Sequence, residues 1–158
     1  MTPTKPACGI CAMIDRIKAS AFPDFIAELK SCYVILGDQQ FYRGYCVLFA
    51  KLHATELYLM PADAARLLSD EMRLVAEAIA VVAKPWKMNY ECLGNSEPHV
   101  HWHLLPRHET DEMRHGPVWL RPESERRVAL EEDDRRALIG SLRHQLAIRF
   151  PDARIPTA

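Results

Sequence analysis

Three histidines alternate with apolar residues in the segment 99–105, which reads HVHWHLL. In a β-strand, residues two positions apart project to the same face, roughly 6.6–7 Å from one another. His99, His101 and His103 would therefore line one face, and the opposite face would carry an apolar set typical of a core. We expect the histidine face to meet solvent, a ligand or the wall of a pocket. A slip of one residue would bury three imidazoles, so the strand register should be strongly specified.

Imidazole can serve as a nucleophile, a general acid or base, a metal ligand or a hydrogen-bond donor to phosphate. The residues alone leave these roles open, including one metal ion bound jointly by all three histidines. The chain has seven histidines in 158 residues, so strict alternation of three is improbable as chance surface polarity. The isolated histidines in charged surroundings are expected to be ordinary surface residues: His108, His115 and His144.

Two of the five cysteines form a C-x-x-C pair, Cys8 and Cys11. Since only one such pair exists, a zinc site here would need two more ligands from histidines. A redox pair would require a thioredoxin-like strand-to-helix context, which the sequence lacks, and two ordinary thiols remain an alternative. We expect no disulfide framework from an odd number of cysteines. The other three lie in expected strands and should be small buried residues: Cys32, Cys46 and Cys92.

The elements that position these residues follow from composition and periodicity. Runs of β-branched and aromatic residues, or alternating polarity, indicate strands at 31–36, 42–51, 86–93 and 99–105. Apolar residues three and four positions apart predict a helix over 62–83, and leucines four apart predict a closing helix at about 132–149. The stretch 106–129 is polar and aperiodic. This order of strands and helices indicates an α+β fold.

Composition excludes several classes of protein. The formal charge is −1, from 20 basic and 21 acidic residues, with 49% hydrophobic residues, as expected for one globular domain over 1–158. Near-neutrality argues against polymeric nucleic acid as a partner. The basic pairs at 126–127 and 135–136 stand beside acidic residues and should be solvated surface. No apolar run is long enough for a membrane span, and a signal peptide is not apparent, so we expect no membrane partner and a cytoplasmic protein.

The segment 99–105 resembles the signature of the histidine triad (HIT) family, in which three histidines alternate with apolar residues and two more apolar residues follow. Gly94 and Ser96 stand where that family has a glycine and a hydroxyl residue. Pro106 and Arg107 continue the motif as in several branches of the family. The stretch 44–53 also resembles a family segment that ends in Lys-x-His, with Lys51 and His53 matching. The likeness spans about residues 8–108, with 109–158 as a C-terminal tail and helix.

This resemblance implies an antiparallel sheet of about five strands with a long central helix and a C-terminal helix. It also implies a nucleotide hydrolase or nucleotidyl transferase in which His101 attacks an α-phosphate and forms a nucleotidyl-histidine. To attack, His101 must be neutral, and its other ring nitrogen should donate to a fixed acceptor such as a backbone carbonyl. His103 and Ser96 would stabilise the phosphate charge.

Further positions are matched to substrate-binding residues of the family. These are Asp38 for the ribose, Asn89 for the phosphate, and Gly94 with Asn95 for main-chain contacts. The chain departs from the common family pattern at Tyr45, Asn95 and Ala50, which leaves a non-catalytic nucleotide sensor as an alternative. The expected substrates are nucleoside phosphoramidates, dinucleoside polyphosphates or related adenylylated compounds.

The resemblance also implies a structural zinc and a second copy of the chain. Zinc-containing relatives join an N-terminal C-x-x-C to two histidines, and the matching ligands here are Cys8, Cys11, His53 and His99. No organic cofactor is implied, and the family pattern predicts a homodimer. Trp119 is either an ordinary packed tryptophan or a side chain that closes over the site.

Overall fold

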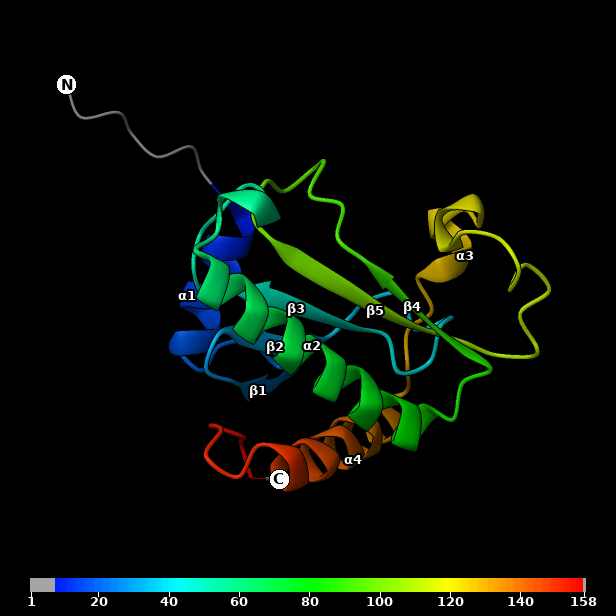
Figure 1. Cartoon of the computed structure of the whole chain (residues 1–158). Coiled ribbons are helices and arrows are strands. Elements are labelled where there is room, and N and C mark those ends of the chain that lie inside the picture. The colour runs from blue at the N-terminus through cyan, green and yellow to red at the C-terminus, as the bar shows by residue number, and fades with distance from the viewer. Residues whose placement is uncertain (1–7, 158) are drawn as a thin grey trace.

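The computed structural model describes residues 8–157 and contains a five-stranded antiparallel sheet in the order β1-β2-β3-β5-β4 (Figure 1). The strands are β1 (Phe25–Glu28), β2 (Cys32–Leu36), β3 (Cys46–Ala50), β4 (Lys87–Glu91) and β5 (His101–Arg107). The α+β class and the sheet of about five strands are therefore confirmed. Four strands fall within or close to the predicted ranges, whereas β1 was not predicted, because four residues give too short a pattern to recognise.

Four α-helices accompany the sheet in the described residues. They are α1 (Gly9–Lys18), α2 (Ala62–Ala83), α3 (Glu123–Arg126) and α4 (Glu132–Arg149), with short 3-10 turns η1 (Leu57–Leu59) and η2 (Val118–Leu120). The helices predicted over 62–83 and 132–149 are confirmed. Helix α1 was missed, although Ile10, Ile14 and Ile17 recur at helical spacing and are all buried.

Helices α2 and α4 cover one face of the sheet, with α2 in front of the strands and α4 beside it (Figure 1). Val34, Leu48 and Leu104 project to that face and share a core with both helices. The other face carries the histidines and is covered by α1 and by residues around Val118. For this reason His99 and His101 are only 1% and 8% exposed. Of the expected surroundings of the histidine face, solvent is therefore excluded for these two rings, and a ligand or the wall of a pocket stays a prediction.

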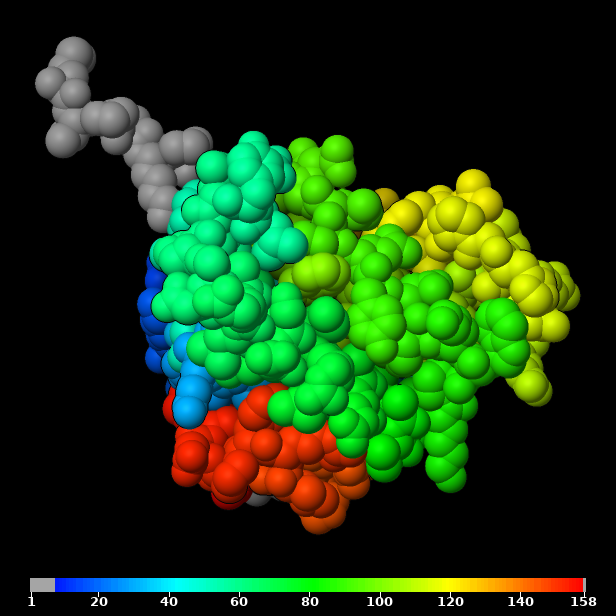
Figure 2. Space-filling model, viewed as in Figure 1, coloured from blue at the N-terminus to red at the C-terminus, as the bar shows by residue number. Residues whose placement is uncertain are grey.

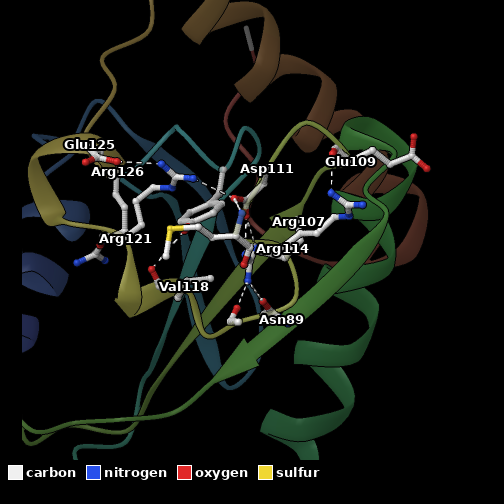
Figure 3. Close-up of polar contacts among 12 residues, drawn as sticks. Asn89, Arg107, Glu109, Asp111, Arg114, Val118, Arg121, Glu125 and Arg126 are labelled. Carbon is white, nitrogen blue, oxygen red and sulfur yellow. Dashed lines mark hydrogen bonds and ion pairs between the residues drawn. The ribbon is translucent and has the colours of Figure 1, made fainter.

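The segment after β5 is ordered by a buried arginine rather than by a periodic apolar pattern. Arg107, only 1% exposed, donates from Nε and Nη2 to the Asp111 carboxylate at 2.8 and 2.5 Å (Figure 3). It also donates to the carbonyl oxygens of Met113 and Gly116 at 2.6 and 2.7 Å. Residues around 110–125, yellow in the space-filling view, form a lobe beside the green region that includes β4 (Figure 2).

Two expectations about single side chains are wrong. Cys92 is exposed rather than buried, because β4 ends at Glu91 and Cys92 begins the following loop. Arg126 is buried at 8% exposure rather than solvated, because it turns inward from α3 to Gln39. Cys32 and Cys46 are buried as predicted.

Strand β4 forms one edge of the sheet and leaves Trp86 and Tyr90 about half exposed beside or on it. The homodimer implied by the resemblance stays a prediction. Among the described residues, none of the helices is long and apolar enough to cross a membrane.

Candidate active site and metal-binding cluster

Strand β5 places the functional histidines in the middle of the sheet, between β3 and β4. His101 pairs with Phe49 and His103 with Val47 across β3, while His103 also pairs with Glu91 on β4. Directly paired residues share a face of the sheet, so these side chains point the same way. Central pairing on both sides fixes the backbone from which the imidazoles project.

The ring of His101 is oriented by a backbone carbonyl. Its Nδ1 lies 2.6 Å from the carbonyl oxygen of His99. A carbonyl oxygen only accepts, so Nδ1 carries the proton and Nε2 keeps its lone pair. This is the arrangement that a nucleophilic imidazole requires, and the predicted backbone acceptor is present.

His103 completes a chain of hydrogen bonds with Tyr45. Its Nε2 lies 3.1 Å from Nε2 of His101, and its Nδ1 lies 2.6 Å from the hydroxyl oxygen of Tyr45. Because His101 Nε2 accepts, His103 Nε2 donates, and the Tyr45 hydroxyl donates to Nδ1. Burial lowers the pKa of His103 from 6.5 to about 4, with further lowering by His101 and the Arg126 charge. Burial also raises the pKa of Tyr45, which keeps its proton. His103 is therefore neutral at pH 7, with a fixed tautomer.

Trp119 lies against this pair, on the 3-10 turn η2. Its ring meets His103 edge to face, with 5.4 Å between ring centroids. Its Nε1 donates to the carboxylate of Glu91, whose pKa is raised by burial. Trp119 is also partly buried against the hydrophobic core on this face of the sheet, so packing and closure over the site both stay compatible with this geometry.

A second cluster lies at the start of β5. The ligand atoms of Cys8, Cys11, His53 and His99 all fall within 4.8 Å of one another. Cys11 Sγ lies 3.3 Å from His53 Nδ1, and His99 Nδ1 lies 3.5 Å from Cys8 Sγ and 3.2 Å from His53 Nδ1. Zinc–sulfur bonds of about 2.3 Å and zinc–nitrogen bonds of about 2.0–2.1 Å give tetrahedron edges of roughly 3.3–3.8 Å. The donor set and its spacing therefore fit a tetrahedral zinc ion.

Two contacts prepare this cluster for a metal. His99 Nε2 lies 2.7 Å from the carbonyl oxygen of Ala50, so Nε2 carries the proton and the lone pair of Nδ1 faces the other ligands. Glu97 accepts from the backbone N–H of Gly9 at 2.9 Å, which fastens the beginning of α1 to the loop before β5. The N-terminal pair is thus held against the histidine strand by contacts outside the ligand set.

The predicted substrate-binding residues are placed less uniformly. Asn95 and Ser96 are exposed in the loop between β4 and β5, and Gly94 takes a positive φ of 76° there, a conformation that favours glycine. Asp38 is exposed and pairs with Arg127 at 2.5 Å. Asn89 accepts from Arg107 Nη1 at 3.0 Å, so its side-chain oxygen belongs to the arginine network. The structure brings His101 and His103 together, whereas the side-chain contacts of Asp38 and Asn89 are with arginines.

A sequence profile of the HIT domain matches residues 20–110, which is more than half of the chain. The chain belongs to the HIT family. Proteins of the HIT family are nucleotide hydrolases and transferases, and they bind nucleotide substrates. No curated protein matches the chain closely enough to count as a relative.

Solved structures of other HIT proteins have the same fold. A histidine triad protein from Marinobacter aquaeolei has 24% identity and a TM-score of 0.68, covering 85% of this chain and 94% of that one. A histidine triad protein from Sinorhizobium meliloti has 22% identity and a TM-score of 0.67, covering 83% and 93%. A zinc-bound histidine triad family protein from Mycobacterium smegmatis has 21% identity and a TM-score of 0.66, covering 90% and 97%.

The sequence did not predict Glu91 as a neighbour of the triad, nor the hydrogen bonds from Tyr45 to His103 and from Trp119 to Glu91. The alternation of side chains along a strand could have predicted the position of Glu91. It lies two positions after Asn89 and therefore projects to the same face of β4. Tyr45 was noted only as a departure from the family. Nothing in the polar stretch around Trp119 signals its contact with His103.

Proposed function

We propose that this HIT protein hydrolyses or transfers nucleotides through a covalent intermediate on His101. The observation that supports this most directly is the bond between His101 Nδ1 and the His99 carbonyl, which leaves the Nε2 lone pair for attack. An imidazole held as this tautomer can act as a nucleophile without first losing a proton. Neutral His103, with Nε2–H beside His101, can donate to a non-bridging phosphate oxygen.

The proposed reaction has two displacements. In the first, the His101 Nε2 lone pair forms a bond to the α-phosphorus, and the bond to the leaving group breaks with its electron pair on that group. The imidazole keeps its Nδ1 proton, so the nucleotidyl-imidazole carries a positive charge next to the His99 carbonyl oxygen. In the second, water or another acceptor attacks the phosphorus, the electron pair of the N–P bond returns to Nε2, and the acceptor loses a proton to solvent.

The alternative in which all three histidines hold one catalytic metal is not supported by the geometry. Both ring nitrogens of His99 are directed elsewhere, Nδ1 to the cluster with Cys8 and His53 and Nε2 to the Ala50 carbonyl. We propose instead that the cluster of Cys8, Cys11, His53 and His99 holds a structural zinc. With four protein ligands such a site is closed, so a bound zinc supplies rigidity and no open position for chemistry.

The experiment for the function replaces the proposed nucleophile. His101→Ala should lower turnover of adenosine phosphoramidate or diadenosine polyphosphates by about 1,000-fold or more, because the intermediate can no longer form. His144→Ala, an exposed histidine on α4, is the matched control and should retain turnover. Mass spectrometry of quenched wild-type protein should find a nucleotidyl adduct on His101.

Undiminished turnover by His101→Ala would contradict the proposed nucleophile. Tight nucleotide binding by wild-type protein with no turnover over a broad substrate panel would favour the sensor alternative. The departure at Tyr45 does not by itself favour a sensor, since its hydroxyl donates to His103.

A further inference from the structure

Arg126 is a buried cation held only by neutral groups. Its guanidinium donates from Nε to the carbonyl oxygen of Arg121 at 2.9 Å and from Nη1 to Oε1 of Gln39 at 2.5 Å. The neighbouring arginines are different. Arg121 pairs with the carboxylates of Asp111 and Glu125 (Figure 3). Arg127 pairs with Asp38. Within residues 8–157, Arg126 forms no ion pair.

This pattern is unusual because buried charges are normally paired with an opposite charge. The residue facing the guanidinium is Gln39, itself buried, whereas the preceding residue Asp38 is turned outward to the exposed Arg127. A glutamine oxygen offsets part of the desolvation cost but carries no formal charge to pair with the guanidinium. The environment of Arg126 is therefore suited to an anion from outside the chain.

The guanidinium also lies next to the histidine pair. It stands 4.6 Å from the centroid of the Trp119 ring, which in turn contacts His103. Its charge lowers the pKa of both His103 and Glu91, against the raising effect of burial at Glu91. The Glu91 carboxylate accepts from Trp119 Nε1 rather than pairing with Arg126. The positive charge of Arg126 thus acts on His103, the residue proposed to donate to a phosphate oxygen.

We propose that Arg126 binds the negative charge of a substrate phosphate beyond the α-phosphate. The site would then prefer nucleoside polyphosphates, including dinucleoside polyphosphates, over phosphoramidates whose leaving group carries no negative charge. This inference rests on the proposed function, because it takes the position of the α-phosphate from the role given to His101. Neither Arg126 nor Gln39 belongs to the motifs that carry the resemblance to the HIT family.

The test compares AMP with ADP as probes, by calorimetric titration of the full chain carrying His101→Ala to prevent turnover. ADP should bind about tenfold or more tightly than AMP, since a charge-assisted hydrogen bond is worth roughly 1.5–3 kcal/mol. Adding Arg126→Gln should remove that preference while AMP affinity changes little. Arg127→Gln, the matched control from the same segment, should keep the preference. Equal affinity of the parent protein for AMP and ADP would overturn the proposal.

The variant Gln39→Glu distinguishes a role of Arg126 in ADP binding from a role in folding. A carboxylate at this position would pair with Arg126, so the protein should unfold at the same or a higher temperature while the ADP preference falls about tenfold. If Arg126 served only to anchor α3, this variant would keep the ADP preference. That outcome would overturn the proposal even if Arg126→Gln failed to fold.

Turnover then distinguishes this inference from the function on which it rests. In protein with His101 intact, Arg126→Gln should lower kcat/KM for diadenosine triphosphate about tenfold more than for adenosine phosphoramidate. An equal decrease for both substrates would contradict the inference and leave the nucleophile proposal standing. An absence of turnover in wild-type protein would contradict the proposed function, whereas the AMP to ADP affinity ratio would still test Arg126.

Discussion

His99 and His101 stand two positions apart on one face, yet their rings use opposite nitrogens. His99 donates from Nε2 to the Ala50 carbonyl and turns Nδ1 toward two cysteines and His53. His101 donates from Nδ1 to the His99 carbonyl and turns Nε2 toward His103. The residue type is the same, but His101 begins β5 whereas His99 lies in the bend before it, and each ring meets a different carbonyl oxygen.

The surroundings follow the same division. The cluster at the beginning of β5 gathers four donors at mutual distances that suit a closed tetrahedron. In the pair at His101 and His103, the hydrogen bonds run in one direction, from Tyr45 through His103 to His101. In our proposal, the first region holds a zinc ion and the second supplies the lone pair that attacks phosphorus.

Removing a ligand from the cluster of cysteines and histidines before β5 should have the largest effect on stability. Cys11→Ser should release the zinc that we expect to copurify at about one per chain, and should lower the free energy of unfolding by on the order of 4 kcal/mol. Metal analysis and urea titration would measure both. Cys92→Ser is the matched control, because Cys92 is exposed and outside the cluster. The zinc proposal would be refuted if wild-type protein contained no metal and had the same free energy of unfolding with and without added zinc.

Removing the Tyr45 hydroxyl, the first donor in the hydrogen-bond chain to His103 and His101, should reduce activity with little effect on zinc binding. Tyr45→Phe removes the donor to His103 Nδ1, so His103 can exchange tautomers and its Nε2 proton is no longer fixed. We expect kcat to fall about tenfold, equivalent to about 1.4 kcal/mol, with KM nearly unchanged. Nitrogen-15 NMR of the imidazoles should show mixed tautomers at His103. A variant with one fixed tautomer and normal kcat would contradict this role.

The smallest expected effect is a dependence of stability on pH that belongs to His103 alone. Its folded pKa of about 4 lies below the ordinary value of 6.5, so between these values the unfolded chain binds more protons. Stability from this residue is complete above pH 6.5 and is lost as the pH falls toward 4. Between pH 7.5 and 5.5 the loss should be about 1 kcal/mol.

Urea titrations of the wild type and His103→Gln at both pH values would isolate this term, because other groups titrate in both proteins. The difference in stability between the two proteins should shrink as the pH falls. A difference that stays constant with pH would show that His103 is not held neutral.

The comparison also explains how far sequence reasoning could reach. The alternation of histidines predicts a shared face, and helix α2 has both the periodicity and the proline start that define its bounds. The zinc ligand set came from the resemblance, and the four residues do lie together. The choice of nitrogen on each ring depends on carbonyl oxygens of Ala50 and His99, and backbone acceptors leave no trace in residue types.

The C-terminal side was harder for a related reason. Arg107 orders the segment 111–116 mainly through two carbonyl oxygens and Asp111, so no apolar period marks it. Arg126 stands next to acidic residues in the sequence, yet its side chain contacts Gln39, which is distant in the chain, and Trp119, which lies across a turn. Neighbouring charges in sequence are a poor guide when a one-turn helix aims one side chain inward.

Residues at both ends of β5 bind segments of the chain that lie outside the matched family domain. At one end, Glu97 and His99 hold α1, and at the other, Arg107 holds the segment that begins at Asp111. Helix α4 adds Leu138, Leu142 and Leu146 to the same core as the strands. The packed core and its hydrogen bonds therefore extend beyond the family domain matched at residues 20–110. A shortened protein cut at that boundary would keep every triad histidine and the carbonyl oxygens that set the ring tautomers, but it would lose Cys8 and Cys11 from the metal cluster and Trp119 from its contact with His103.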